Sequence, residues 1–306
     1  MRILLVVNKT LRNQTSEWID GGYWNVYLPL KELGHDVYFY DTVRGIEEPF
    51  SDIIDTFKPE LIFCCMTGNR YMTPFEPWPA IEKETQKGNC RTFNWFCDDT
   101  WRFDNFSSQV CKYFHVCSTP EKRYVEKFRS IGYNNIIVGQ WHVNSSLLPS
   151  RTKSKKYDAS FCGQLLGERA TAIEYLKENG VNIKKFHGLE YEDMLKGLSE
   201  SRIGINFSKN YNGIPPKTQM KLRMFEVPAA NSLLFTEYHD EIEDYFQIDK
   251  EVVCFQSPLE MLEKMKALLK NKAIIEKISE NGHKRFMKDH RSTVRLQKLL
   301  DNIMKI

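Results

Sequence analysis

The stretch "KLRMFEVPAANSLLFTE", residues 221–237, predicts a helix that runs directly into a buried strand. Its first part places apolar residues at helical spacing, and "SLLFTE" (232–237) is a short apolar run typical of a strand. Asn231 stands between the two, where a residue in the left-handed conformation often ends a helix, and Pro228 predicts a local kink. We therefore interpret the stretch as one helix–strand unit of an α/β sheet.

The N-terminal half repeats this alternation of strands and helices. Short apolar runs predict strands at residues 2–7, 36–41, 60–66, 91–97, 113–118 and 135–141, with helices at 24–34, 50–57 and 120–132. Strands that are apolar almost throughout are typical of a parallel sheet that helices cover on both faces. Residues 1–148 are therefore expected to form a Rossmann-like domain.

The C-terminal half predicts a second domain of the same α/β class. The polar, basic stretch "PSRTKSKK" (149–156) interrupts the pattern, and the alternation then resumes. Strands are predicted at 157–163, 182–188, 202–208, 232–237 and 251–256, with helices near 168–179, 191–199, 219–230 and 240–246. We expect a second Rossmann-like domain at 157–280, facing the first across a cleft, followed by C-terminal helical residues 281–306.

The composition is that of a globular protein with a large core. The chain has 306 residues, of which 42% are hydrophobic, and its formal net charge of +3 is too small to argue for nucleic acid. No run approaches the roughly 18 apolar residues of a membrane span, and the first residues do not resemble a signal peptide, so a cytoplasmic protein is expected. Eight scattered cysteines without CxxC spacing favour reduced core residues over a zinc or redox site.

Charged residues near the predicted strand ends are the first candidates for a binding site. Gly163 follows a strand and Arg169 lies in the first turn of the next helix, where backbone N–H groups favour an anion. Lys221 and Arg223 lie within one turn of Glu226, an arrangement that suits the phosphates and the ribose hydroxyls of a nucleotide. The alternative is that these side chains are merely solvated, as most charged residues on helices are.

Several stretches of the sequence resemble one known family, the CgeB-like glycosyltransferases, which are relatives of the GT-B group that uses nucleotide-sugar donors. The resemblance is most specific in the C-terminal half and looser in the N-terminal half, and it rests on "FCGQLLGER" (161–169), "KLRMFEVPAANSLLFTE" (221–237), "ISENGHKRFMKDHRSTVRLQKLL" (278–300), "GGYWNVYLPLKELGHDV" (21–37) and "WFCDDTWRF" (95–103). It implies the GT-B fold, in which a C-terminal helix crosses back to the N-terminal domain.

The resemblance also implies roles for the charged residues of the C-terminal half. Glu226 corresponds to the ribose-binding acidic residue, and Arg169 with Lys221 or Arg223 resembles the basic residues that neutralise the departing diphosphate. Thr218 stands eight positions before Glu226, where many retaining relatives carry another Glu, so the stereochemical outcome stays open. Such enzymes generally need no metal and no cofactor, and a UDP-sugar is the expected donor substrate.

The N-terminal half supplies the candidates for the acceptor side. Asp98 and Asp99 directly follow a predicted strand, so one of them either acts as a general base on the acceptor hydroxyl or merely caps a helix or turn. Gly21 and Gly22 either let an acceptor or sugar approach the backbone or simply start a helix. His142 is a substrate-binding candidate, against the alternative of a hydrogen-bonded core histidine.

Two rival functions remain open from the sequence. One is a glycosyltransferase that modifies DNA bases, for which "RTKSKK" (151–156) and the basic C-terminus are the candidate DNA-binding segments. The other is a non-catalytic sugar-nucleotide-binding protein, suggested by Thr218. The acceptor is undefined and can be a glycan, a small molecule, a protein or modified DNA. Closure about a hinge near 145–156, with a second crossing near 280–290, is expected to bring donor and acceptor together.

Overall fold

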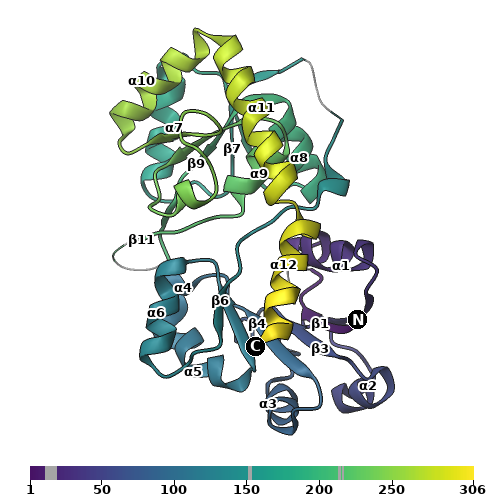
Figure 1. Ribbon diagram of the computed structural model, residues 1–306. Helices are drawn as coiled ribbons and strands as arrows, with labels where there is room; N and C mark the ends of the chain where they lie inside the picture. Colours follow the sequence, from purple (N-terminus) through teal and green to yellow (C-terminus); the bar gives the residue numbers. More distant parts are fainter. Residues whose placement is uncertain (11–18, 151–153, 213–214, 216) are drawn as a thin grey trace. The chain divides into compact units, whose positions relative to one another are not determined.

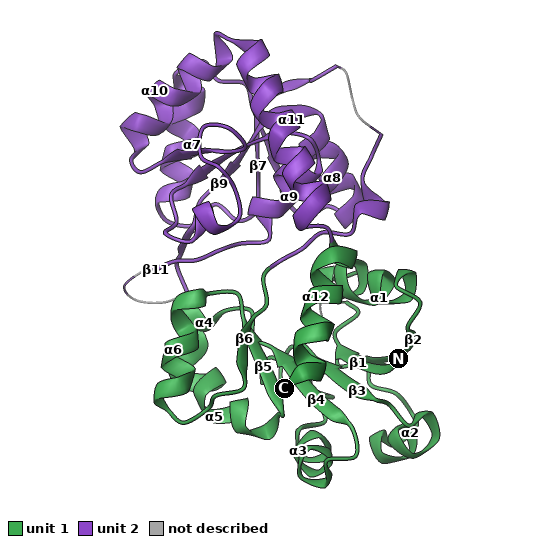
Figure 2. Ribbon diagram, viewed as in Figure 1, with its two compact units in different colours: residues 1–140, 292–306 green, residues 141–291 purple. Residues whose placement is uncertain are grey.

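The computed structural model describes residues 1–10, 19–150, 154–212, 215 and 217–306, and it divides into two compact units (Figure 2). Unit 1 contains residues 1–140 and 292–306, and unit 2 contains residues 141–291.

These boundaries differ from the expected linker at 149–156 and from the expected start of the last segment at 281. The reason is that the chain after Gln140 already packs within unit 2: the indole nitrogen of Trp141 donates to the carbonyl of Met220 at 3.0 Å, and Val143 forms a parallel bridge with Arg291. Part of the expected hinge and of the basic stretch, residues 151–153, lies outside the described residues.

Unit 1 is built on a six-stranded parallel sheet with the strand order β2-β1-β3-β4-β5-β6 (Figure 1). Its strands are β1 (Arg2–Val7), β2 (Asp36–Asp41), β3 (Leu61–Cys64), β4 (Arg91–Trp95), β5 (Val116–Thr119) and β6 (Ile136–Val138). Its helical segments are η1 (Tyr23–Tyr27), α1 (Leu28–Glu32), α2 (Phe50–Phe57), α3 (Trp78–Lys87), α4 (Asp99–Arg102), η2 (Phe103–Ser107), α5 (Ser108–Val110), η3 (Cys111–Tyr113), α6 (Lys122–Ser130) and α12 (Ser292–Lys305).

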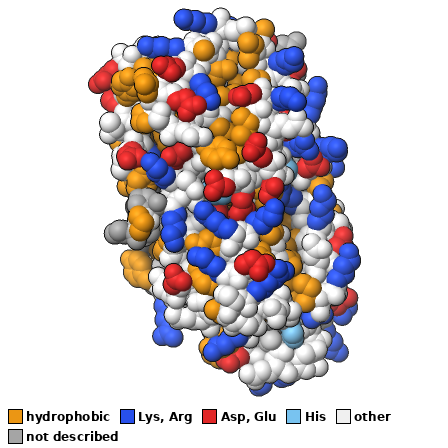
Figure 3. Space-filling model, turned by 60° about the vertical axis from the view of Figure 1, so that its left-hand side comes forward, with side chains coloured by type: hydrophobic (Ala, Val, Ile, Leu, Met, Phe, Trp, Pro, Cys, Tyr) orange, Lys and Arg blue, Asp and Glu red, His pale blue; other side chains and the backbone are white. Residues whose placement is uncertain are grey.

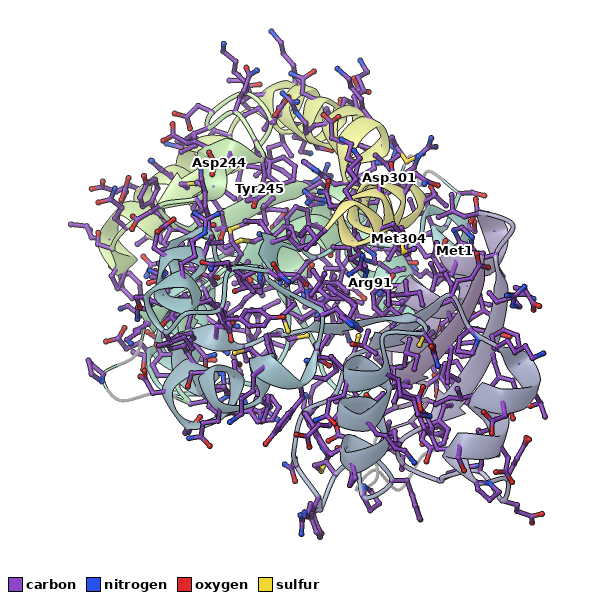
Figure 4. All side chains as sticks on the ribbon, turned by 60° about the horizontal axis from the view of Figure 1, so that its bottom comes forward. Met1, Arg91, Asp244, Tyr245, Asp301 and Met304 are labelled. Atoms are coloured by element: carbon purple, nitrogen blue, oxygen red, sulfur yellow. The ribbon has the colours of Figure 1, made fainter. Side chains whose placement is uncertain are left out.

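The central strands of unit 1 are buried on both faces, as the apolar runs predict. In β1, Ile3 to Val7 are each at most 2% exposed, which is the burial expected of a parallel strand with helices on both sides of the sheet. The C-terminal helix α12 packs against α1 and β4, so the end of the chain completes the N-terminal unit. Figure 4 labels Asp301 and Met304 on this helix and Arg91 at the start of β4.

Unit 2 is built on a five-stranded parallel sheet with the order β13-β12-β9-β7-β8, and a two-stranded antiparallel hairpin follows β9. Its strands are β7 (Tyr157–Cys162), β8 (Ile183–Phe186), β9 (Ser201–Asn206), the hairpin strands β10 (Lys209–Asn210) and β11 (Lys217–Thr218), β12 (Leu233–Glu237) and β13 (Val253–Phe255). Its helical segments are η4 (Ser145–Leu147), α7 (Glu168–Glu178), α8 (Tyr191–Ser199), α9 (Arg223–Ala229), η5 (Ile242–Asp244), α10 (Pro258–Leu269) and α11 (Lys272–Asp289).

The helix–strand unit at 221–237 forms as predicted, with a shorter helix. Asn231 has a φ of 54°, which confirms the left-handed residue at the helix end. Helix α9 begins at Arg223 and not at 219 as expected. The N–H of Gln219 still donates to the carbonyl of Ser208 at 3.0 Å, so this residue continues the pairing of the hairpin. All eight cysteines are free thiols, and five of them are buried.

Candidate functional site

The strand order of unit 2 reverses between β7 and β9. From β7 the chain adds β8 on one side, and β9, β12 and β13 follow on the other. In open α/β sheets a ligand crevice forms at such a point, outside the carboxyl ends of the strands. A cavity of about 240 Å³ lies there, and we call it the β7–β9 cavity; it is lined by Phe161, Cys162, Gly163, Arg169, Asn206, Phe207, Lys221, Leu222, Arg223 and Glu226.

All five residues predicted to bind the nucleotide line this one cavity: Gly163, Arg169, Lys221, Arg223 and Glu226. They come from two segments that lie far apart in the sequence. The segments meet because β7 and β9 are neighbouring parallel strands, whose carboxyl ends lie at the same edge of the sheet. The informative signals were the position of Arg169 after a strand and the spacing of Lys221, Arg223 and Glu226 within one helical turn.

Two cations of the cavity share one backbone oxygen. Arg169 Nη2 donates to the carbonyl of Lys209 at 2.6 Å, and Lys221 Nζ donates to the same oxygen at 2.7 Å and to the carbonyl of Phe207 at 2.7 Å. Burial lowers the pKa of Arg169, but a guanidinium still keeps its charge at neutral pH. Because a carbonyl is a neutral acceptor, these bonds hold the two cations in place without cancelling their charge.

The segment that carries this carbonyl is itself anchored. The backbone N–H of Lys209 donates to Glu237 Oε2 at 3.0 Å, and Lys209 Nζ lies 2.7 Å from Glu168 Oε2. In the hairpin, Lys209 pairs with Thr218 of strand β11. Thr218 is the residue that stands where many retaining relatives carry a Glu. Sequence reasoning missed Lys209, because it contributes its main-chain carbonyl oxygen. Every residue type has this atom, so the sequence does not show which residue uses it.

Glu226 and Arg223 form an ion pair within the cavity. Glu226 Oε2 lies 2.7 Å from Arg223 Nη1, and the side chain of Glu226 is only 3% exposed. The same Arg223 nitrogen lies 2.7 Å from the sulfur of Met194. Arg223 is thus neutralised by its neighbour one turn along α9.

Two glycines shape the backbone at the entrance to α7. Gly163 has a φ of 137° and Gly167 a φ of 55°, and L-residues adopt both conformations only with strain. A Cβ atom at Gly167 would lie 2.7 Å from the ring of Tyr211. The centroid of the same ring lies 5.1 Å from the guanidinium carbon of Arg169. The absence of a side chain at Gly167 therefore leaves room for Tyr211 to contact Arg169.

A family model described as "Glycosyl transferase-like" matches residues 146–301, which is 156 of the 306 residues. The chain therefore belongs to the glycosyl transferase-like family. This confirms the resemblance to CgeB-like glycosyltransferases, and the matched range contains every residue that lines the β7–β9 cavity. No curated protein matches the chain significantly.

Solved glycosyltransferase structures share the fold over nearly the whole chain. A glycosyltransferase from Rickettsia africae is 13% identical with a TM-score of 0.63, covering 99% of this chain and 98% of its own. The Anabaena protein Alr3699/HepE, solved with UDP, is 8% identical with a TM-score of 0.59 and full coverage of both chains (100% and 100%). A DNA-modifying β-glucosyltransferase, solved with and without uridine diphosphoglucose, is 11% identical with a TM-score of 0.64 and the same full coverage (100% and 100%). These similarities confirm the GT-B fold class.

The acidic pair of this glycosyl transferase-like chain lies at the start of α4, after β4. Asp98 occupies the N-cap position without a side-chain capping bond and is partly exposed, whereas Asp99 is buried, with 1% of its surface exposed. Burial raises the pKa of Asp99 to about 6, and the neighbouring carboxylates Asp98 and Glu121 add to the rise. Neither carboxyl oxygen of Asp99 has a hydrogen-bond partner of good geometry among the described residues.

The glycine pair lies at the N-terminus of η1. The N–H of Gly22 donates to Asp20 Oδ1 at 2.9 Å, and a Cβ atom at Gly22 would lie 2.7 Å from a methyl group of Val7 in β1. A close approach of helix and strand therefore requires glycine at position 22. Asp20, which sequence reasoning did not single out, caps this helix start, and burial raises its pKa.

His142 lies in unit 2 and is 2% exposed. It does not line the β7–β9 cavity. Among the described residues, no group of three or more His, Cys, Asp and Glu side chains is arranged to hold a metal ion. None of the helices in the described parts of the chain has the length and apolar character that crossing a bilayer requires.

Proposed function

We propose that this chain transfers a sugar from a UDP-sugar to an acceptor hydroxyl, and that the nucleotide diphosphate binds in the β7–β9 cavity. The observation that carries this proposal is the pair of cations, Arg169 and Lys221, fixed on the carbonyl of Lys209 at the switch point of the unit 2 sheet. Membership of the glycosyl transferase-like family supports the choice of donor, and so do the two structural neighbours solved with UDP and with uridine diphosphoglucose.

The two cations suit the leaving group of the reaction. When the bond between the sugar and the diphosphate breaks, negative charge develops on the departing phosphate oxygens, and preorganised cations stabilise it. Arg169 offers a planar fork for two phosphate oxygens, and Lys221 offers a compact charge. Helix α7, eleven residues long, begins next to the cavity, and the N–H groups at a helix N-terminus favour an anion.

Glu226 is the proposed ribose ligand. Its carboxylate is held by Arg223 at 2.7 Å, and a carboxylate that accepts two vicinal hydroxyls is a common solution for nucleoside recognition. In this assignment Arg223 does not contact phosphate but orients Glu226. The proposed phosphate ligands are then Arg169 and Lys221, with Gly163 allowing close approach of the backbone.

The acceptor must lose a proton as the new bond forms. The acceptor oxygen bonds to the anomeric carbon, the bond from that carbon to the diphosphate oxygen breaks, UDP leaves, and the hydroxyl proton passes to a base. We propose Asp98 and Asp99 as the candidates for this base. Asp98 is the partly exposed member of the pair, and Asp99 is the member whose pKa of about 6 lies near the operating pH that suits a general base.

Calorimetric titration with UDP tests the nucleotide assignment. The double variant Arg169→Gln, Lys221→Gln is expected to bind UDP at least tenfold more weakly than the unaltered chain, because charge-assisted bonds to phosphate are lost. Lys277→Gln, an exposed lysine on α11, serves as the matched control and should bind normally. Equal affinities for the double variant and the unaltered chain would remove the β7–β9 cavity as the nucleotide site.

Release of UDP from UDP-glucose, with and without acceptor mixtures, separates an enzyme from a non-catalytic binding protein. If DNA is the acceptor, the protein should be retained on immobilised DNA. This binding should weaken steeply with salt, since phosphate contacts release counterions. The face drawn in Figure 3 intersperses Lys and Arg with Asp and Glu. Because the formal net charge of +3 is too small to argue for nucleic acid, we place a small hydroxylated acceptor ahead of DNA.

A further inference from the structure

A second cavity occupies the corresponding switch point in unit 1. The strand order of that sheet reverses between β1 and β3, with β2 on one side and β4 to β6 on the other. A cavity of about 200 Å³ lies beyond the carboxyl ends of these strands, and we call it the β1–β3 cavity. It is lined by residues that follow β1, β2, β3 and β4 in turn. No residue discussed as part of the proposed donor site contributes to it.

The lining of the β1–β3 cavity is mostly short, neutral and polar. Asn8, Thr10, Thr67, Asn69 and Thr73 supply amide and hydroxyl groups. Some of these groups are already bonded within the protein: the hydroxyls of Thr67 and Thr73 lie 2.9 Å apart, and Asn69 Oδ1 accepts from the N–H of Tyr71 at 3.1 Å. Its volume is below the roughly 300–1,000 Å³ of pockets for drug-sized ligands. The cavity therefore suits one small hydroxylated unit, such as a single sugar or polyol.

One cation stands among these neutral groups. Arg102, at the end of α4, donates through Nη2 to the carbonyl of Thr67, and its guanidinium carbon lies 4.2 Å from the ring centroid of Phe106. Within the described parts of the chain, no carboxylate forms an ion pair with Arg102. A guanidinium has five N–H donors, so a carbonyl and an aromatic face orient it while leaving donors for a ligand.

The carboxylate of Glu76 fixes the loop after β3. Glu76 accepts from the backbone N–H of Gly68 at 2.8 Å, from the indole N–H of Trp78 at 2.9 Å and from the hydroxyl of Thr73 at 2.8 Å. These bonds fix the loop that forms one side of the cavity.

We propose that the β1–β3 cavity binds the acceptor, and that the acceptor is a small hydroxylated molecule that carries an oxyanion, phosphate or carboxylate, held by Arg102. This inference rests on the proposed glycosyl transfer and names the acceptor class for it. The neutral polar lining recognises the hydroxyls, and the guanidinium recognises the anion. A DNA acceptor would need several phosphate-binding cations, whereas the described residues that line this cavity include one.

Binding of matched probes tests the inference without knowledge of the natural acceptor. Ligand-observed NMR titrations use D-glucose 6-phosphate, D-glucuronate and neutral D-glucose, with inorganic phosphate as a competitor and a DNA oligonucleotide duplex as a further probe. We expect one or both anionic sugars to bind at least tenfold more tightly than glucose. Which of the two binds more tightly identifies the oxyanion as phosphate or carboxylate.

Two variants and one control localise the effect. Arg102→Gln is expected to remove the preference for the anionic probes, with affinity reduced about tenfold or more, while glucose is unaffected. Val43→Phe narrows the cavity without altering Arg102 and should weaken charged and neutral sugars alike, which keeps the test valid if Arg102→Gln does not fold. Arg129→Gln, an exposed arginine on α6 paired with Glu126, should change nothing.

The outcomes separate this inference from the proposed function, because UDP is titrated against the same samples. If UDP binds but glucose binds as tightly as both anionic sugars, the acceptor inference is wrong and the donor proposal stands. If the anionic sugars bind at Arg102 but UDP does not bind, the donor proposal is wrong and the β1–β3 cavity remains a site for an anionic hydroxylated ligand. Tight binding of the DNA duplex that Val43→Phe leaves intact would overturn the acceptor class.

Discussion

Replacing Asp99 with Asn should make the protein more stable at neutral pH. Asp99 is buried, with 1% of its surface exposed, and neither carboxyl oxygen has a hydrogen-bond partner of good geometry among the described residues. Burial of the charged form raises the pKa of this carboxyl, while the nearby hydroxyls of Ser107 and Thr119 act in the opposite direction. An amide of the same shape carries no charge and avoids this desolvation cost.

The size of the effect follows from the shift in pKa. The value rises from 3.8 to about 6, a difference of about 2 units, and each unit corresponds to about 1.4 kcal/mol. Because the folded state holds this proton more tightly than the unfolded state, the contribution is fully present below about pH 4 and is lost as pH rises through about 6. At pH 7.5 the ionised carboxylate should therefore cost about 3 kcal/mol of unfolding free energy, and at pH 5 about half of that.

Urea denaturation at pH 5.0 and 7.5 measures this cost. We expect the stability advantage of Asp99→Asn over the unaltered chain to be larger at pH 7.5 by about 1.5 kcal/mol. Asp104→Asn, an exposed carboxylate nearby in the sequence, is the matched control and should show no such difference. If Asp99→Asn destabilised the protein at pH 7.5, or if its advantage did not grow with pH, the carboxylate would be a stabilising part of the scaffold and the reasoning would be refuted.

Three further changes test other parts of the structure. Asp98→Asn should leave UDP affinity unchanged but lower the rate of transfer by about 100-fold, the usual scale for a lost general base, and normal turnover would exclude this residue as the base. Glu226→Gln keeps the shape of the side chain but should weaken UDP binding at least tenfold in calorimetry, whereas unchanged affinity would remove the ribose assignment. Gly167→Ala should cost more unfolding free energy than the control Gly180→Ala. Both glycines have positive φ (55° and 85°), so both substitutions carry a backbone penalty of about 1 kcal/mol, but only a Cβ atom at position 167 clashes with a neighbour, the ring of Tyr211. Equal costs would show that this ring moves freely.

The sheets could be predicted from the sequence because buried parallel strands are apolar without interruption. The run at residues 2–7 coincides with β1, and the run at 36–41 coincides with β2. Helix α3 was not predicted, because Pro77 and Pro79 at its start are also typical of a loop, although proline is well tolerated in a first helical turn. The short helical pieces between residues 99 and 113 were missed because none is long enough to establish a periodic pattern.

The binding site could be predicted only as far as side-chain type and strand position reveal it. Arg169 was predicted from its position after a strand, and Lys221 and Glu226 from their spacing on one helix. The resemblance to CgeB-like glycosyltransferases assigned all three to one donor site, and all three line the β7–β9 cavity. Sequence alone could not show that Arg223 is neutralised by Glu226, or that the carbonyl of Lys209 holds two cations. These facts depend on rotamers and on main-chain oxygens, which the residue pattern does not encode.

The two cavities follow one architectural rule but differ in charge, and this difference supports the two ligands that we propose. Each lies where the strand order of its sheet reverses, beyond the first and third strands of its unit. The β7–β9 cavity holds two cations, Arg169 and Lys221, on neutral carbonyl groups, as a diphosphate with charge on both phosphoryl groups would require. Among the described residues that line the β1–β3 cavity, Arg102 is the one cation and its neighbours carry hydroxyls and amides, which suits a ligand with one anionic group and several hydroxyls. Because the backbone rule is shared, the side chains placed at the strand ends, and not the fold, determine which ligand each unit binds.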